Sequence, residues 1–367
     1  MLRRIDLYLV ETELKVRFET SFGGAKKRQA VLVRVEERGG EVGWGEAPAD
    51  QGPWYSYETS ETAFYIISQF LSEYAFQVED PKEFMKKAER VRGHSMAKAG
   101  LEMALWDLAA KLEGKPLWKY IGGVRDKIES GVSVGIARDV DELIAWVEGY
   151  LEKGYRRVKL KIKPGWDYEI VKRVRKEFGD IPLQVDANAA YRLEDWPHLR
   201  KLDEFDLLML EQPLHYNDLV MHSKLASLIK TPICLDESIK EPRDVYAGYA
   251  IGSFHVVNVK PARVGGLTNT IEINEFTQKV GVPIWIGGML ETGVGRGHLV
   301  AAATLSNVKF PNDVSASDRY YEEDLVEPPW ILNPDGTISA PNRPGIGVEV
   351  LEERVERHTL KRTTLKS

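Results

Sequence analysis

Hydrophobic residues follow three successive patterns along the chain. Over residues 1 to about 55 they alternate with polar residues, as in RIDLYLVE and QAVLVRVEE, and the glycines of RGGE at 38–41 predict a hairpin into VGWGEA. Between residues 60 and 123 they recur at helical spacing, and beyond residue 126 short apolar runs alternate with helical stretches. This order predicts an α+β segment followed by a barrel of repeated βα units.

Charged residues mark the ends of five consecutive apolar runs in the repeated part. The runs VKLK, PLQVD, LLMLE, PICLD and HVVNVK end at Lys161, Asp186, Glu211, Asp236 and Lys260, which lie 24 or 25 residues apart. One βα unit takes roughly this length of chain, so the five residues are expected at one height on successive parallel strands. Any one of them could equally be a solvent-facing charge. Five in phase indicate the C-terminal rim of a closed barrel, where active sites are built.

The strand VKLKIK carries three lysines on one face. Alternation sends its Val, Leu and Ile residues toward the outer helices and Lys159, Lys161 and Lys163 inward. The period of about 25 residues selects Lys161 as the reactive base, with Lys159 one layer deeper as a cationic neighbour and Lys163 at the loop. An exposed edge strand that carries lysines on one face is the alternative.

Three consecutive carboxylates in the series indicate a metal site. Asp186, Glu211 and Asp236 offer only oxygen ligands, and the chain has no HExxH or CxxC motif. Hard oxygen ligands with room for water and a substrate carboxylate favour Mg²⁺ or Mn²⁺ over zinc. Asn188 and Asn258 share strand faces with members of the series and are expected to orient them.

Two amines on opposite sides of a divalent cation suit removal of a proton α to a carboxylate, through an enediolate. Lys161 and Lys260 are the candidate bases. Lys159 and the cation are expected to lower the pKa of Lys161, and Arg263 to lower that of Lys260. Two reactive lysines permit racemisation, whereas one reactive lysine beside a charge-stabilising one gives syn elimination. The rival hypotheses are a Schiff-base aldolase on the same barrel and an inactive binding paralogue.

Composition narrows the class of partner and compartment. A net charge of −6 and a pI near 5.8, with no basic stripe, argue against a nucleic-acid or anionic-membrane partner. No apolar run approaches the roughly 18 residues of a membrane span, and the first residues resemble a strand rather than a signal peptide. The one cysteine, Cys234, excludes internal disulfides, suits a reducing cytoplasm and is expected to be buried and inert.

These motifs resemble a known family. VKLKIKPGWD, LQVDAN, LLMLEQPL, PICLDESI and VVNVKPARVGG are similar to the enolase superfamily, muconate-lactonizing-enzyme subgroup, and GGMLETGVGR and SASDRYY to its branch of o-succinylbenzoate synthases and N-succinylamino (N-acylamino) acid racemases. The resemblance spans essentially the whole chain. It implies a (β/α)₇β modified TIM barrel at 126–325, an α+β capping domain at 1–125, and a segment at 326–367 that returns to the cap.

The resemblance also assigns roles to residues. It implies Asp186, Glu211 and Asp236 as ligands of Mg²⁺ (or Mn²⁺), and Lys161 and Lys260 as the acid/base pair, assisted by Lys159, Glu237, Asn258 and Arg263. Substrate contacts are expected from loops near residues 20 and 50 of the cap and from the residues Phe22, Ser133, Asn188, Gly288, Met289 and Leu290. The aromatic residues Trp54, Tyr55 and Tyr57 are open between core packing and substrate contact.

The implied activity is proton transfer on a small carboxylate substrate. A lysine at 260 excludes the His-Asp base of mandelate racemases, and SDRYY lacks the Asp-x-Asp pair by which dipeptide epimerases hold an α-ammonium. Arg263 favours racemisation of N-succinyl or other N-acyl amino acids, with o-succinylbenzoate synthase activity as well. The synthase of menaquinone biosynthesis as the sole role, or a muconate cycloisomerase-like lyase, are the alternatives. A homo-oligomer is expected, because capped barrels often assemble.

Overall fold

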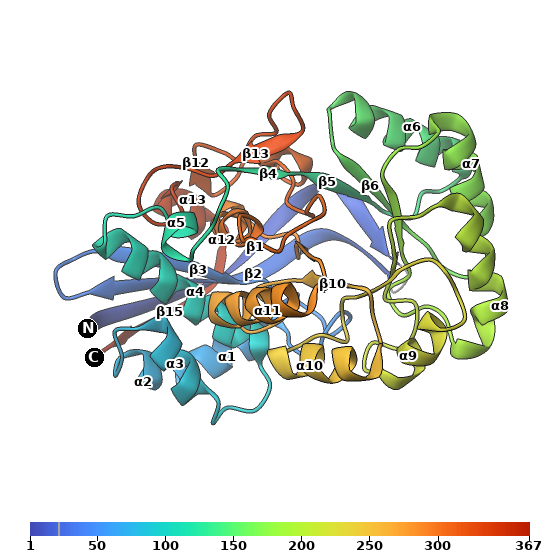
Figure 1. Ribbon diagram of the computed structural model, residues 1–367. Coiled ribbons are helices and arrows are strands. Elements are labelled where there is room, and N and C mark those ends of the chain that lie inside the picture. The colour runs from blue at the N-terminus through green and yellow to red at the C-terminus, as the bar shows by residue number, and fades with distance from the viewer. Residues whose placement is uncertain (21–22) are drawn as a thin grey trace.

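The N-terminal part of the chain forms an antiparallel sheet that is completed by the C-terminus. The computed structural model describes residues 1–20 and 23–367. Strand order in this sheet is β15-β1-β2-β3, so the two chain ends lie side by side (Figure 1). The predicted hairpin at 38–41 is present, since β2 pairs with β3. The strands are β1 (Leu2–Thr20), β2 (Gly23–Glu37), β3 (Val42–Ala47) and β15 (Thr359–Lys366).

Helices cover one face of this sheet and complete the cap. The buried helix α4 packs closely on β3, because a Cβ added at Gly43 or Gly45 would lie 2.2 Å from a backbone oxygen of that helix. Side chains of Thr59 and Asp80 cap α1 and α3. The helical segments are α1 (Ser60–Ile66), the π-helical η1 (Ile67–Leu71), α2 (Ser72–Ala75), α3 (Pro81–Ala88), α4 (Ser95–Leu112) and α5 (Leu117–Tyr120).

Seven parallel strands form the second part, in the order β11-β10-β9-β8-β7-β6-β5. They are β5 (Gly131–Val134), β6 (Arg157–Lys161), β7 (Leu183–Asp186), β8 (Leu210–Glu211), β9 (Ile233–Leu235), β10 (Val256–Val259) and β11 (Ile284–Ile286). Residues 308–313 lie between the two edge strands: parallel bridges join Ile284 to Val308 and Ser130 to Asn312. This segment takes the place of an eighth strand and closes the barrel.

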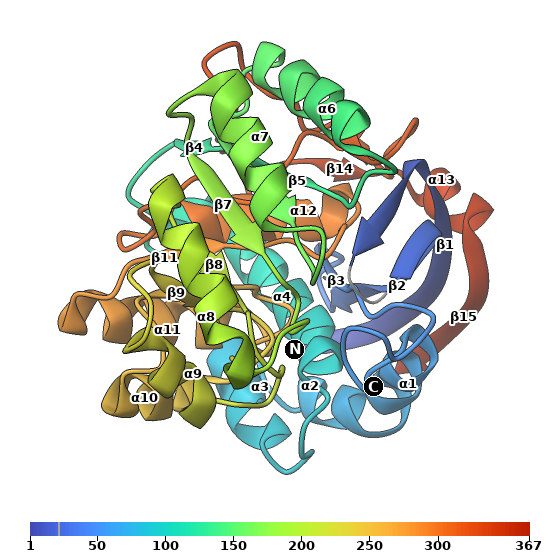
Figure 2. The same ribbon diagram turned by 90° about the vertical axis from the view of Figure 1, so that its right-hand side faces the viewer.

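Helices surround the strands, as Figure 2 shows for α6, α7, α9, α10 and α11. They are α6 (Val140–Glu152), α7 (Tyr168–Phe178), α9 (Val220–Ala226), α10 (Pro242–Ile251), α11 (Leu267–Val280) and α12 (Gly293–Ala303). Apolar strand residues such as Val158 and Leu160 are fully buried between strands and helices. The architecture confirms the predicted capped TIM-like barrel.

The stretch between β7 and β8 does not form one continuous helix. It is divided into η2 (Leu193–Asp195), α8 (Trp196–Leu199) and η3 (Arg200–Phe205). Pro197 within it has no backbone N–H to donate.

The Pro-Asp-Gly sequence at 334–336 directly precedes β13 (Thr337–Ser339), which pairs with β4 (Lys127–Glu129). Further along the tail, β12 (Val326–Glu327) pairs with β14 (Glu349–Val350), and α13 (Glu352–Arg357) precedes β15. The tail therefore contacts the base of the barrel before its last strand joins the cap sheet.

Candidate active site

The five charged residues of the series lie at the same end of five adjacent strands. Lys161, Asp186 and Glu211 are the last residues of β6, β7 and β8, and they are neighbours in the strand register. Asp236 and Lys260 directly follow β9 and β10. All five side chains are buried. The regular spacing in the sequence thus corresponds to one cluster in space.

Lys161 lies on one side of this cluster. Its Nζ donates to Asp186 Oδ2 at 2.6 Å and to Asn188 Oδ1 at 2.8 Å. The amide of Asn188 in turn donates to Glu237 Oε1 at 2.9 Å. Lys163, two residues farther along, lies beyond the strand end at the loop, as expected, but it is exposed and does not point inward as the alternation predicted. Only two of the three lysines therefore enter the site.

Lys159 plays a different part from the one expected. Its Nζ lies 2.5 Å from Asp313 Oδ2, 3.1 Å from Glu211 Oε2 and 3.4 Å from Asp186 Oδ2. Burial lowers the pKa of Lys159, but these three carboxylates outweigh burial and the pKa is raised. Its charge is neutralised by carboxylates, so Lys159 is not the unpaired cation beside Lys161 that the sequence led us to expect. We assign Lys159 to holding the carboxylates in place.

Lys260 and Asp236 share a half-buried tyrosine from the cap. Lys260 Nζ donates to Asp236 Oδ2 at 2.9 Å and to the Tyr55 hydroxyl at 3.1 Å, and that hydroxyl lies 3.1 Å from Asp236 Oδ1. Burial lowers the pKa of Lys260, but Tyr55 and the acidic groups Glu237 and Glu211 outweigh burial, so its pKa is raised. The expected lowering of this pKa is absent. Of the three aromatic residues near position 55, Trp54 and Tyr55 line the pocket, and Tyr55 is the one that contacts Lys260 and Asp236.

Arg263 also differs from expectation. Its guanidinium donates to Asp236 and to the backbone oxygens of Ile239 and Asn258, so it braces a carboxylate rather than repelling Lys260 directly. Burial lowers the pKa of Arg263. The physical reason for the difference is that the carboxylate of Asp236 lies between the two cationic side chains, with one oxygen paired to each.

The carboxylates have the donor chemistry of a divalent-cation site, although each is already held by cationic or amide groups. Glu211 accepts from Asn258 at 2.7 Å and from Gln184 at 3.0 Å, in addition to Lys159. Among residues 1–20 and 23–367, no three acidic, histidine or cysteine side chains converge as a preassembled ligand group. Glu237 Oε2 is nevertheless buried with no partner in the described part of the chain. An unsatisfied buried carboxylate oxygen beside three other oxygen-ligand residues fits a hard cation or its water.

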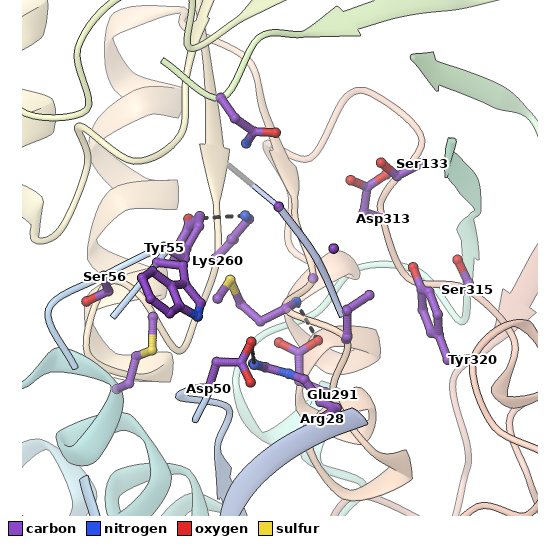
Figure 3. Close-up of a pocket in the computed structure, with 18 of the residues that line it drawn as sticks. Arg28, Asp50, Tyr55, Ser56, Ser133, Lys260, Glu291, Asp313, Ser315 and Tyr320 are labelled. Atoms are coloured by element: carbon purple, nitrogen blue, oxygen red, sulfur yellow. Dashed lines mark hydrogen bonds and ion pairs between the residues drawn. The ribbon is translucent and has the colours of Figure 1, made fainter. Parts of the chain in front are cut away.

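A pocket of about 380 Å³ opens onto this cluster. Both Lys161 and Lys260 line it, together with the predicted substrate contacts Ser133, Asn188, Gly288, Met289 and Leu290. Phe22, predicted as a further contact, lies outside the described residues. Figure 3 shows Tyr55 beside Lys260, and Arg28, Asp50 and Glu291 grouped on a different side of the pocket from Ser133 and Tyr320.

Several pocket residues were not predicted. Outside the expected cap loops, these are Arg28, Glu58, Met96, Glu291, Arg296, Leu299, Asp313, Ser315 and Tyr320; Asp50 and Trp54 belong to the loop near residue 50 that was expected to contact substrate. One usable signal was present: continuing the period of about 25 residues past Lys260 leads to β11 and then to the closing segment 308–313. Asp313, at the end of that segment, pairs with Arg157 at 2.8 Å as well as with Lys159.

Unusual backbone conformations mark the strand ends around the site. Asn188, Ala189, Gln212 and Leu290 have φ values of 43°, 63°, 36° and 62°, a region that non-glycine residues seldom adopt. Gln212 directly follows Glu211, and its Oε1 accepts from the backbone N–H of Asp236 at 3.0 Å. Such strain persists only where surrounding contacts hold it, and it is found preferentially at functional sites.

The fold and this cluster define a capped barrel that collects lysines and carboxylates at the C-terminal ends of its strands. Residues 4–122 match the mandelate racemase/muconate lactonizing enzyme N-terminal domain, and residues 142–354 match the enolase C-terminal domain-like family. The chain therefore belongs to the enolase superfamily, and it is an enzyme.

The similarity to known proteins extends over nearly the full length of this chain and of each relative. The chain is 46% identical over 352 residues to an o-succinylbenzoate synthase of Geobacillus kaustophilus, covering 95% of this chain and 94% of that protein. It is 45% identical to an N-succinylamino acid racemase of Thermus thermophilus, covering 97% and 96%. A solved enolase-superfamily structure from Listeria innocua superposes with a TM-score of 0.95 at 38% identity, covering 100% and 99%.

Proposed function

We propose that the enzyme removes the proton α to a carboxylate with Lys161 and Lys260 as its two acid/base groups, and that it racemises N-succinyl or other N-acyl amino acids. One observation carries this proposal: both lysines are buried, line the same pocket, and contact different carboxylates of the series. A reacting carbon between them is reached from either side. Two-sided proton transfer is what racemisation requires.

Asp186, Glu211 and Asp236 would hold Mg²⁺, with Mn²⁺ as the alternative. What such a cation supplies when bound is electrostatic stabilisation of the substrate's enediolate. Asn258 donates to Glu211 and so orients this ligand directly. Glu237 follows Asp236 in the chain and accepts from the amide of Asn188.

The lysines act as general acid and base in turn. A base must be neutral, and the acid on the opposite side protonated, before each turnover. The contacts of Lys161 with Asp186 and of Lys260 with Tyr55 fix both ammonium positions.

A second activity is suggested by two relatives that carry different names. The o-succinylbenzoate synthase of Geobacillus kaustophilus and the N-succinylamino acid racemase of Thermus thermophilus are similar to this chain at nearly equal identity. We therefore propose o-succinylbenzoate synthase activity by syn dehydration as well, in which one lysine transfers the proton and the other stabilises charge. The synthase alone, or a muconate cycloisomerase-like lyase, are the alternatives.

No helix in the described ranges is long and apolar enough to cross a membrane. A cytoplasmic location and a homo-oligomeric assembly stay predictions from the sequence.

The test is proton NMR of N-succinyl-L-amino acids incubated in D₂O with Mg²⁺, beside an absorbance assay for o-succinylbenzoate. Loss of the α-proton signal with inversion, abolished by EDTA, is the expected result. Dehydration without exchange would leave the synthase alternative. Silence in both assays would refute the proposal, and activity that survives EDTA together with trapping by borohydride would favour the aldolase hypothesis.

A further inference from the structure

The backbone of Gln212 leaves β8 at a point where three strand ends meet. Gln212 directly follows Glu211, is fully buried and has a φ of 36°. Its N–H donates to the backbone oxygen of Cys234 at 2.8 Å, where the pairing of β8 with β9 ends. Its backbone oxygen is turned the other way and accepts from the N–H of Ala189, in the loop after β7, at 2.8 Å. The backbone of this one residue therefore joins β7, β8 and β9.

The side chain of Gln212 continues the pairing that its backbone leaves. In a parallel pair that ran on, the N–H of Asp236 would donate to the backbone oxygen of Gln212. That oxygen is used by Ala189, and the side-chain oxygen takes its place. Gln212 Oε1 accepts from the backbone N–H of Asp236 at 3.0 Å and from that of Ser238 at 3.2 Å. Gln212 Nε2 donates to Ser238 Oγ at 2.7 Å, so the amide grips the loop after β9 at three points.

The same amide is anchored to its own loop. Gln212 Nε2 also lies 3.3 Å from the backbone oxygens of Leu214 and His215. The N–H of Leu214 donates to Nε2 of His222 in α9 at 3.1 Å. His222 is fully buried, and burial lowers its pKa, so the ring stays neutral and can accept this bond. The amide of Gln212 has both its donors and its acceptor in use, which leaves it one orientation.

The strands that Gln212 joins carry the three candidate metal ligands. Asp186 and Glu211 end β7 and β8, and Asp236 directly follows β9. Other buried side chains hold the carboxylates themselves, whereas Gln212 holds the backbone from which they project. Mg²⁺ requires short distances and near-octahedral geometry, whereas Ca²⁺ accepts longer distances and a variable number of ligands. A rigid backbone beneath the ligands therefore favours the smaller cation.

We propose that Gln212 is a positioning residue that fixes the strand ends carrying Glu211 and Asp236, and that it thereby makes the site selective for Mg²⁺ over Ca²⁺. This inference rests on the proposed function, because it takes Asp186, Glu211 and Asp236 as the ligand set. Gln212 does not line the pocket. Its effect on a cation passes through the backbone N–H of Asp236.

The test is calorimetric titration of the full-length protein with Mg²⁺ and, separately, with Ca²⁺. Gln212→Met keeps the approximate length of the side chain and the backbone bonds of residue 212, but it removes the amide. The Kd for Mg²⁺ should rise about 10- to 100-fold, the range for loss of a group that orients a ligand. The Kd for Ca²⁺ should rise less, so the preference for Mg²⁺ should fall. Ser238→Ala removes only the 2.7 Å contact and should lower this preference by a smaller amount.

A matched control separates selectivity from general loss of packing. Asn307 is also a buried amide that joins two segments, because its Nδ2 donates to Thr277 Oγ1 at 3.0 Å and to the backbone oxygen of Val282 at 2.7 Å. These contacts lie before β11 begins, at the opposite end of the strands from the ligands. Asn307→Leu should lower thermal stability and leave both cation affinities unchanged.

The outcomes distinguish this inference from the proposed function. An unchanged Mg²⁺ affinity in Gln212→Met, an equal loss for both cations, or a wild type that does not prefer Mg²⁺ would overturn the inference. Where Gln212→Met does not fold, an unchanged preference in Ser238→Ala would overturn it. Asp236→Asn that binds Mg²⁺ as tightly as the wild type would instead refute the ligand set, and with it the proposed function.

Discussion

Replacing each reactive lysine in turn separates a two-base mechanism from a one-base mechanism. In Lys161→Ala and in Lys260→Ala, inversion should be lost, because each enantiomer needs one lysine to remove the proton and the other to return it. Each variant should still exchange the α-proton of one enantiomer, the one whose proton faces the remaining lysine. The two variants should retain opposite enantiomers.

The size of the effect follows from the contacts. Loss of a positioned acid or base lowers the rate about 10²- to 10⁴-fold, or roughly 3 to 5 kcal/mol in the barrier. Lys161→Ala leaves Asp186 with the backbone N–H of Asn188 at 2.9 Å and Lys159 at 3.4 Å. The carboxylate keeps two donors, so the free energy of unfolding should fall by only about 1 to 3 kcal/mol. The variant should remain folded at room temperature.

The assay is NMR exchange in D₂O with N-succinyl-L- and N-succinyl-D-amino acids and Mg²⁺, with polarimetry for inversion. Lys163→Ala is the matched control, because Lys163 lies on the same run of sequence but is exposed. Near wild-type racemisation in either lysine variant would refute the two-base assignment. Exchange of the same enantiomer by both variants would refute the placement of the lysines on opposite sides of the substrate.

Three further predictions concern the groups beside the lysines and in the cap. Asp236→Asn should weaken Mg²⁺ binding and activity together; an unchanged affinity in calorimetry would remove Asp236 from the ligand set. Tyr55→Phe removes a hydroxyl 3.1 Å from Lys260 and should lower kcat about 10-fold. The control Tyr57→Phe, at an exposed residue, should leave kcat unchanged. Equal kcat values for the two variants would contradict this prediction. Burial and a neighbouring carboxylate raise the pKa of Glu46 from 4.5 to about 7. Because the pKa is higher in the folded state than in the unfolded state, the contribution of Glu46 to the free energy of unfolding, relative to Glu46→Gln, is fully present below about pH 4.5. It should fall by about 3 kcal/mol as the pH rises through 7. A difference in urea unfolding between the two proteins that does not change with pH would contradict this.

The charged series was predictable because each member ends a strand of a repeated unit. A βα unit has a nearly constant length, so equal spacing in sequence becomes equal height in the barrel. Alternation then placed Lys159 and Lys161 inside, and both line the pocket. The same rule failed for Lys163, which is exposed because the strand ends at Lys161. Local periodicity was therefore sufficient to predict which charged residues cluster at the strand ends.

Partner choice within the site was not predictable in the same way. Lys159 was expected to perturb Lys161, but it reaches Asp313, 154 positions later in the chain, whose segment closes the barrel. Arg263 was expected to act on Lys260, yet Asp236 lies between them. Periodicity fixes the height and face of a residue, whereas ion pairing depends on the rotation of side chains across the barrel and on loops outside the repeat.

The contacts between cap and barrel depend on pairs that no local pattern can reveal. Glu102 of α4 accepts from the backbone N–H of Leu267 at the start of α11, and Glu46 of β3 accepts from that of Gly295 in the first turn of α12, over 165 and 249 residues of sequence. Buried carboxylates at these positions satisfy the free amide donors of a helix start and its positive dipole. Helix α11 follows the loop after Lys260, and α12 follows the loop that lines the pocket. The cap thus holds the helix that follows Lys260 and the helix that follows the pocket-lining loop 288–291, so it helps to position the candidate active site.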